Sequence, residues 1–153
     1  MFRSKIFKFV EDKFDVLETV FILALLASAI VMMNEISYAL YGIWGSLSLL
    51  ALLYFLMSLR PFEEKKVAGL RIIIRRVVYI SYAFGCMTVL SVFQFDGEIN
   101  SHKLILFTLA FIGVSVVALL LLRFKMNVKK QVFGLLLRCA IFAAVLTWLW
   151  TMY

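Results

Sequence analysis

Five long apolar runs, separated by short polar segments, dominate the pattern of this chain and occupy residues 17–33, 38–58, 77–95, 104–122 and 132–153. A bilayer's hydrocarbon core is about 30 Å thick, and an α-helix crosses it with about 20 mostly apolar residues. Barrel strands would alternate apolar and polar residues, and these runs do not. Because lipid offers no partner to unpaired backbone groups, the runs must be helices. The pattern therefore predicts an all-α integral membrane protein built as a five-transmembrane-helix bundle.

Residues 1–16 have a different pattern, in which apolar residues recur at spacings of three or four and charged residues fall mostly between them. The apolar positions are Phe2, Ile6, Phe9, Val10 and Phe14. This pattern predicts an amphipathic N-terminal helix that lies at the membrane interface before the first span. The alternative is that the helix packs on the cytoplasmic loops of its own chain.

The beginning of the chain also has two features of a signal peptide, a basic start and the small residues Ala27, Ser28 and Ala29. Acidic residues within the leading segment and an apolar run that continues to Met33 argue against cleavage. We therefore expect the first span to be retained.

The composition leaves little room outside the membrane, because 65% of the 153 residues are apolar and the five runs use most of the chain. We expect one polytopic membrane domain over residues 1–153. The two cysteines, Cys86 and Cys139, lie inside predicted spans, where they are interpreted as small packing residues. No spacing of ligand residues indicates a metal site.

Basic residues are distributed unequally between the two sides of the predicted bundle. Residues 1–16, 59–76 and 123–130 contain four, six and four of the sixteen Lys and Arg residues. Short loops rich in Lys and Arg stay in the cytoplasm, so the N terminus is predicted inside and the C terminus outside. The small size suggests a bacterial inner (cytoplasmic) membrane.

The clustered basic residues on this side suggest a binding surface as well as an orientation signal. The predicted docking residues are Lys65, Lys66, Arg71, Arg75, Arg76, Lys129 and Lys130, and together with Arg123 and Lys125 they form what we call the basic collar. Such a surface attracts anionic lipid headgroups or an acidic cytoplasmic partner. Nucleic acid is not expected as a ligand, because no recognition module is present.

Pairs of small residues four positions apart recur in four spans and predict close helix packing. The pairs are Ala24 with Ser28, Gly42 with Ser46, Ser81 with Gly85, and Ala140 with Ala144. They serve either packing within one bundle or contacts between the subunits of a homo-oligomer.

Arg138 lies about 12 Å along its helix from Lys130, inside the predicted apolar zone. A charge at this depth must reach the interface, form an ion pair or meet water. Glu18 is the best candidate partner, because it lies one turn into the first predicted helix, which enters from the same side. The remaining interpretation is an ion-binding or lipid-binding site.

No catalytic motif is present, and the only histidine, His102, falls in a predicted outer loop, so neither an enzyme nor a cofactor is expected. The leading hypothesis is a non-catalytic membrane subunit that oligomerises or anchors a cytoplasmic partner through the basic collar. One alternative is a small oligomeric pore-forming or membrane-perturbing effector, for example in bacterial stress or phage defence. Another is a small-solute or lipid transporter that uses Arg138 and Glu18. The residues considered as an oligomeric pore lining are Ser46, Ser48, Thr88, Ser91, Thr108 and Ser115.

Overall fold

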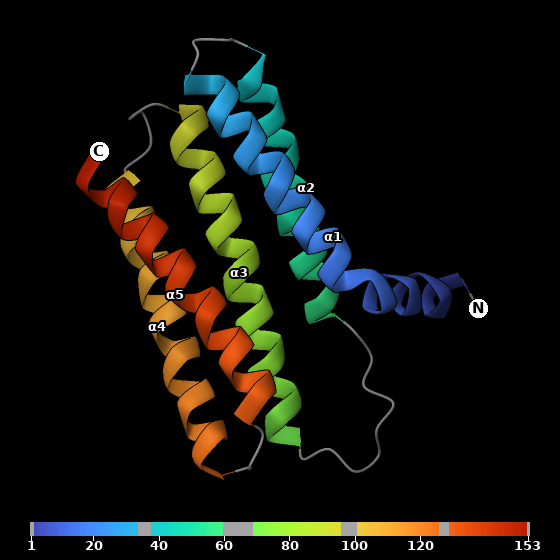
Figure 1. Ribbon diagram of the computed structural model, residues 1–153. Coiled ribbons are helices and arrows are strands. Elements are labelled where there is room, and N and C mark those ends of the chain that lie inside the picture. Colours follow the sequence, from blue (N-terminus) through green and yellow to red (C-terminus); the bar gives the residue numbers. More distant parts are fainter. Residues whose placement is uncertain (1, 34–37, 60–68, 96–100, 126–128, 153) are drawn as a thin grey trace.

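The computed structural model describes residues 2–33, 38–59, 69–95, 101–125 and 129–152, which form five α-helices and, within these ranges, no strand (Figure 1). The helices are α1 (Phe2–Met33), α2 (Ala39–Ser58), α3 (Gly69–Phe95), α4 (Ser101–Lys125) and α5 (Lys129–Met152). Each contains a stretch long and apolar enough to cross a membrane. The predicted all-α architecture with five such helices is confirmed, and it indicates an integral membrane protein.

Two helices extend well beyond the apolar runs that predicted them. The third helix begins at Gly69, eight residues before its apolar run, so that Arg71, Arg75 and Arg76 lie on its first turns. Residues 2–16 and the first apolar run form one helix, α1, rather than two separate elements. In Figure 1 the first turns of α1 run at a steep angle to the rest of that helix. Their placement at a membrane interface stays a prediction.

The helices pack in an order that leaves α1 at the edge of the bundle. Helix α2 packs against both α1 and α3, helix α3 also packs against α4 and α5, and α4 packs against α5. Among the described helices, α1 has close backbone neighbours only in α2. Accordingly, α1 is the least buried of the five spans and α3 is the most buried.

The packing of α4 and α5 follows a seven-residue repeat that their apolar sequences conceal. Helix α4 buries Ile105, Thr108, Ile112, Ser115, Leu119 and Leu122. Helix α5 buries Val132, Cys139, Leu146 and Leu149. Spacings of three, four and seven residues place these side chains on one seam of each helix, as in left-handed helix pairs. Position in this repeat, rather than polarity, decides which side chains face the core.

Candidate functional site

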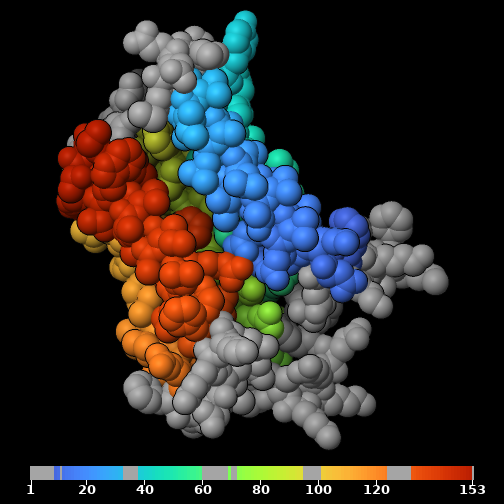
Figure 2. Space-filling view, in the orientation of Figure 1, coloured from blue at the N-terminus to red at the C-terminus, as the bar shows by residue number. Residues whose placement is uncertain are grey.

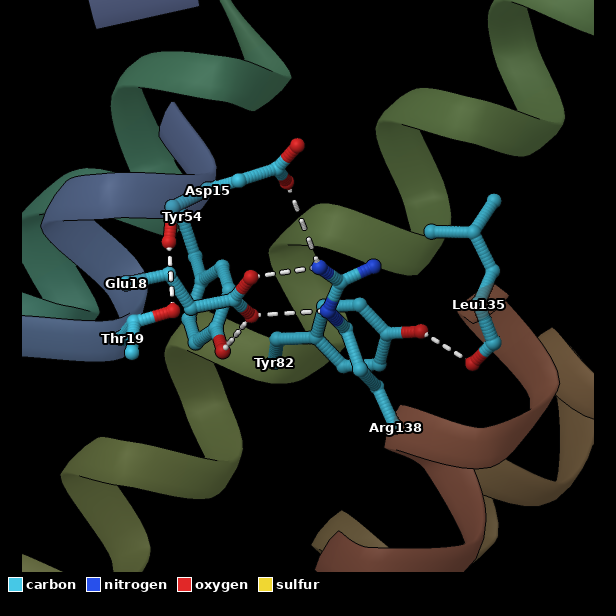
Figure 3. Close-up of polar contacts among 7 residues, drawn as sticks. All are labelled: Asp15, Glu18, Thr19, Tyr54, Tyr82, Leu135 and Arg138. Carbon is cyan, nitrogen blue, oxygen red and sulfur yellow. Dashed lines mark hydrogen bonds and ion pairs between the residues drawn. The ribbon is translucent and has the colours of Figure 1, made fainter. Parts of the chain in front are cut away.

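The structure brings Glu18 of α1 and Arg138 of α5 together in a two-point ion pair (Figure 3). Nε of Arg138 donates a hydrogen bond to Oε1 of Glu18 at 2.7 Å, and Nη2 donates to Oε2. The planar guanidinium group matches the two carboxylate oxygens in this geometry. The pair therefore joins two helices that have no close backbone contact.

Both charges lie at the same depth along their helices. The candidate spans begin at Asp12 in α1 and at Val132 in α5. Glu18 and Arg138 are each six residues farther along, so each lies about 9 Å from the first residue of its span. The Glu18 side chain is only 7% exposed, whereas the Arg138 side chain is 28% exposed. A carboxylate this well buried is stable only when it is paired, because it has lost its hydration.

Tyr54 adds a third helix to this site. Its phenol donates a hydrogen bond to Oε1 of Glu18 at 2.7 Å, so this one oxygen accepts from both α2 and α5. Sequence reasoning missed Tyr54, although its place four residues before the end of its span at Ser58 puts it near the depth of Glu18. The carboxylate of Glu18 thus connects α1, α2 and α5.

Asp15 contributes a second carboxylate on the exposed side of the pair. Its Oδ1 lies 3.8 Å from Nη2 of Arg138, and its side chain is 91% exposed. Because Asp15 is three residues before Glu18, both acidic side chains lie on neighbouring positions of one helical face. With Asp15 and Glu18 ionised, the three charged groups sum to −1, so the site is not an anion site of the ordinary kind.

Aromatic rings pack around the pair. The Phe14 ring centroid lies 5.8 Å from Cζ of Arg138 and contacts the rings of Tyr54 and Tyr79 at centroid distances of 6.2 and 5.8 Å. A guanidinium group over an aromatic face gains a cation–π attraction. In such surroundings the charge-assisted hydrogen bonds are stronger than they would be in water.

Tyr82 of α3 extends the site toward α5 by another route. Its phenol donates a hydrogen bond to the backbone oxygen of Leu135 at 2.5 Å, and its ring stacks on Phe142 at a centroid distance of 5.5 Å. Gly85 makes room for this stack, because a Cβ atom there would lie 2.8 Å from Cδ1 of Phe142. The predicted packing position Gly85 therefore contacts α5 within the chain.

The other predicted packing residues have two different environments. Gly42 faces Ser28, whose hydroxyl oxygen would collide with a Cβ atom at position 42, so α1 and α2 approach closely there. Ser46 is buried one turn farther along α2. In contrast, Ala140 and Ala144 are exposed on α5.

Hydroxyl side chains form two rungs between the antiparallel helices α3 and α4. Ser81 pairs with Ser115 at 2.6 Å and Thr88 pairs with Thr108 at 2.7 Å, and all four side chains are buried. The seven-residue spacing on each helix was a sequence signal that could have revealed this register. Thr88, Thr108 and Ser115 were candidates for a pore lining and Ser81 was a candidate packing residue, but these hydroxyl groups bind one another inside the bundle.

The basic collar is only partly within the described residues, since Lys65 and Lys66 lie outside them. The backbone of Arg71 is in the first turn of α3, and Lys129 and Lys130 begin α5. Arg76 is exposed, while Arg75 is half-buried with its guanidinium 5.9 Å from the Tyr79 ring. The start of α3, the end of α4 and the start of α5 lie at one end of the bundle (Figure 1).

The described residues place no group of three or more His, Cys, Asp or Glu side chains where it would hold a metal ion. No protein-family model matches the chain, and no match was found among curated proteins or among solved structures. Function is therefore inferred from two features of the chain itself, which are the buried ion pair and the charge at one end of the bundle.

Proposed function

We propose that this protein is a non-catalytic subunit of a membrane complex that anchors an acidic cytoplasmic partner through the basic collar. It would cross a bacterial inner membrane five times, with the N terminus in the cytoplasm and the C terminus outside. Several copies would associate in the complex.

The distribution of charge over three helices carries this proposal. Helices α3, α4 and α5, as described, contain no Asp or Glu, and seven of their nine basic residues belong to the collar. Of the other two, Arg138 is neutralised by Glu18, and Lys103 is near the opposite end of α4. A surface with one sign of charge attracts acidic partners and repels basic ones.

The interior of the bundle is better suited to holding helices together than to moving a solute. Glu18 accepts three hydrogen bonds from Tyr54 and Arg138 and is almost fully buried. A carboxylate engaged in this way has little capacity left for a passing substrate. The same reasoning applies to the hydroxyl rungs between α3 and α4, and both features favour a subunit over a transporter or a pore.

The first test compares two exposed basic residues at opposite ends of the bundle, Arg76 and Lys103. We expect Arg76→Gln to lower the fraction of tagged protein in the hetero-complex on native gels of cell membranes, and Lys103→Gln to leave it unchanged. Each basic residue near an acidic surface contributes about 1 kcal/mol. Replacing Arg71, Arg75 and Arg76 together should therefore weaken the complex about a hundredfold at low salt.

Salt separates this electrostatic mechanism from a packing contact. Exposed charges are screened beyond about 10 Å at 0.1 M salt, so the difference between the native and triple-variant proteins should shrink as salt rises. Correct insertion of each variant is checked by protease accessibility. If the triple variant retains the complex at low salt, the collar only orients the protein and the proposed anchoring role is wrong.

A further inference from the structure

The edge of the bundle between α1 and α5 has the features of a lipid-binding site. No Cα atom of the described α1 lies within 8 Å of a Cα atom of α5, so only long side chains bridge the two helices. Figure 2 shows the surface of α3 recessed between the outer parts of α1 and α5. Both helices run in the same direction from the ion pair (Figure 1).

Each of the two helices has a stripe of exposed or half-buried side chains at helical spacing that includes its charged residue. On α1, Asp15, Thr19, Ile22 and Leu26 lie at helical spacing and are all exposed. The first two are polar and the last two are apolar. On α5, the corresponding stripe consists of Gly134 and Arg138, which are half-buried, followed by two exposed apolar residues. The apolar members are Ile22 and Leu26 on α1 and Ile141 and Val145 on α5. Each stripe is therefore polar at one end and apolar beyond it, which matches the shape of an amphiphile.

The polar end presents both signs of charge to one ligand. Asp15 is three residues into its candidate span and Arg138 is six, so the two lie about 4.5 and 9 Å from the ends of their spans. This is the level at which lipid headgroups and long polar side chains meet. The carboxylate of Asp15 is highly exposed, and 28% of the Arg138 side chain remains accessible beside it.

We propose that the gap between α1 and α5 binds one phosphatidylethanolamine molecule from the bilayer. Its ammonium group binds the Asp15 carboxylate, its phosphate binds the accessible side of the Arg138 guanidinium, and one acyl chain follows the apolar stripes. The ammonium donates three hydrogen bonds, whereas the quaternary ammonium of phosphatidylcholine donates none. A purely anionic headgroup would face the extra negative charge of Asp15. The proposal does not depend on the basic collar.

The test measures lipid binding to the purified full-length protein by native mass spectrometry. The probes are phosphatidylethanolamine, phosphatidylcholine and phosphatidylglycerol with identical acyl chains, titrated one at a time. We expect phosphatidylethanolamine to bind most tightly at a single site. Asp15→Asn should weaken that binding about tenfold, the loss expected for one exposed charge-assisted hydrogen bond.

Asp12→Asn is the matched control, because Asp12 is also an exposed aspartate on α1 and lies one turn before Asp15. It should leave phosphatidylethanolamine binding unchanged. Equal binding of the three lipids, equal effects of the two variants, or tighter binding of phosphatidylglycerol than of phosphatidylethanolamine to the native protein would overturn the proposal. So would a dimer that phosphatidylethanolamine does not dissociate and that cross-links α1 of one copy to α5 of another, since a second copy would then fill the gap.

Discussion

Removing either member of the Glu18–Arg138 pair should destabilise the bundle, but by different amounts. After Arg138→Ala, Glu18 would keep only the hydrogen bond from Tyr54 and would remain buried. After Glu18→Ala, Arg138 is already part-exposed and has Asp15 nearby. Breaking a buried pair costs about 3–5 kcal/mol, so we expect about 5 kcal/mol for Arg138→Ala and about 3 kcal/mol for Glu18→Ala.

The double variant tests whether the two residues act through one another. Once neither charge is present, no charged group is left buried without its partner, although the Tyr54 phenol loses its acceptor. The loss should be about 5 kcal/mol rather than about 8, since contacting residues couple by about 0.5–3 kcal/mol. Free energies of unfolding are measured in bicelles by steric trapping. Asp15→Ala serves as the control and should cost less than about 1 kcal/mol, because its carboxylate is exposed.

Two results would refute this reasoning. Losses that add within about 0.5 kcal/mol would mean that Glu18 and Arg138 are not coupled. A larger loss for Glu18→Ala than for Arg138→Ala would mean that the arginine, not the glutamate, is the residue that depends on its partner.

Two further predictions concern helix packing and orientation. Gly42→Ala should cost about 1–3 kcal/mol, because the new Cβ collides with the Ser28 side chain, and Ser28→Gly should rescue this variant. The control Gly45→Ala on the same helix meets nothing within 4 Å, so it should be neutral or slightly stabilising and should not respond to Ser28→Gly. Equal effects of the two glycine variants in thermal unfolding would contradict the close approach of α1 and α2. For the orientation, a phosphatase reporter fused after Tyr153 should be active in bacteria and one fused after Lys129 inactive, and the reverse result would place the basic collar outside.

The number and type of helices were predictable because each helix that crosses lipid needs a run of about 20 mostly apolar residues, which is readily recognised in a sequence. A run such as 104–122 can only be a spanning helix. The exposed and buried faces of that helix were not predictable in the same way, because nearly every residue is apolar and polarity does not distinguish the two faces. Only the seven-residue spacing of Thr108 and Ser115, with the matching Ser81 and Thr88, contained that information.

The site was partly predictable for a related reason. Arg138 and Glu18 are charged residues at similar depths in spans that enter from one side, so their pairing follows from the cost of an isolated charge in lipid. The parts that the sequence did not indicate, Tyr54 and the aromatic rings, depend on rotation about the helix axis. An aromatic side chain is equally acceptable in lipid and in the core, so its polarity does not indicate whether it faces the lipid or the core.

The long separation of Glu18 and Arg138 in the chain bears on how the protein is made. The two residues are 120 positions apart, so at about 5–20 residues per second the acid is synthesised roughly 6–24 seconds before its base. Tyr54 follows Glu18 by only 36 positions and is therefore available first. During that interval the α1–α2 hairpin contains a carboxylate with one donor and no counterion. Arrival of α5 completes the site, so a truncated chain that lacks α5 keeps an unpaired acid in the membrane, the kind of defect that a membrane quality-control protease can distinguish from the finished protein.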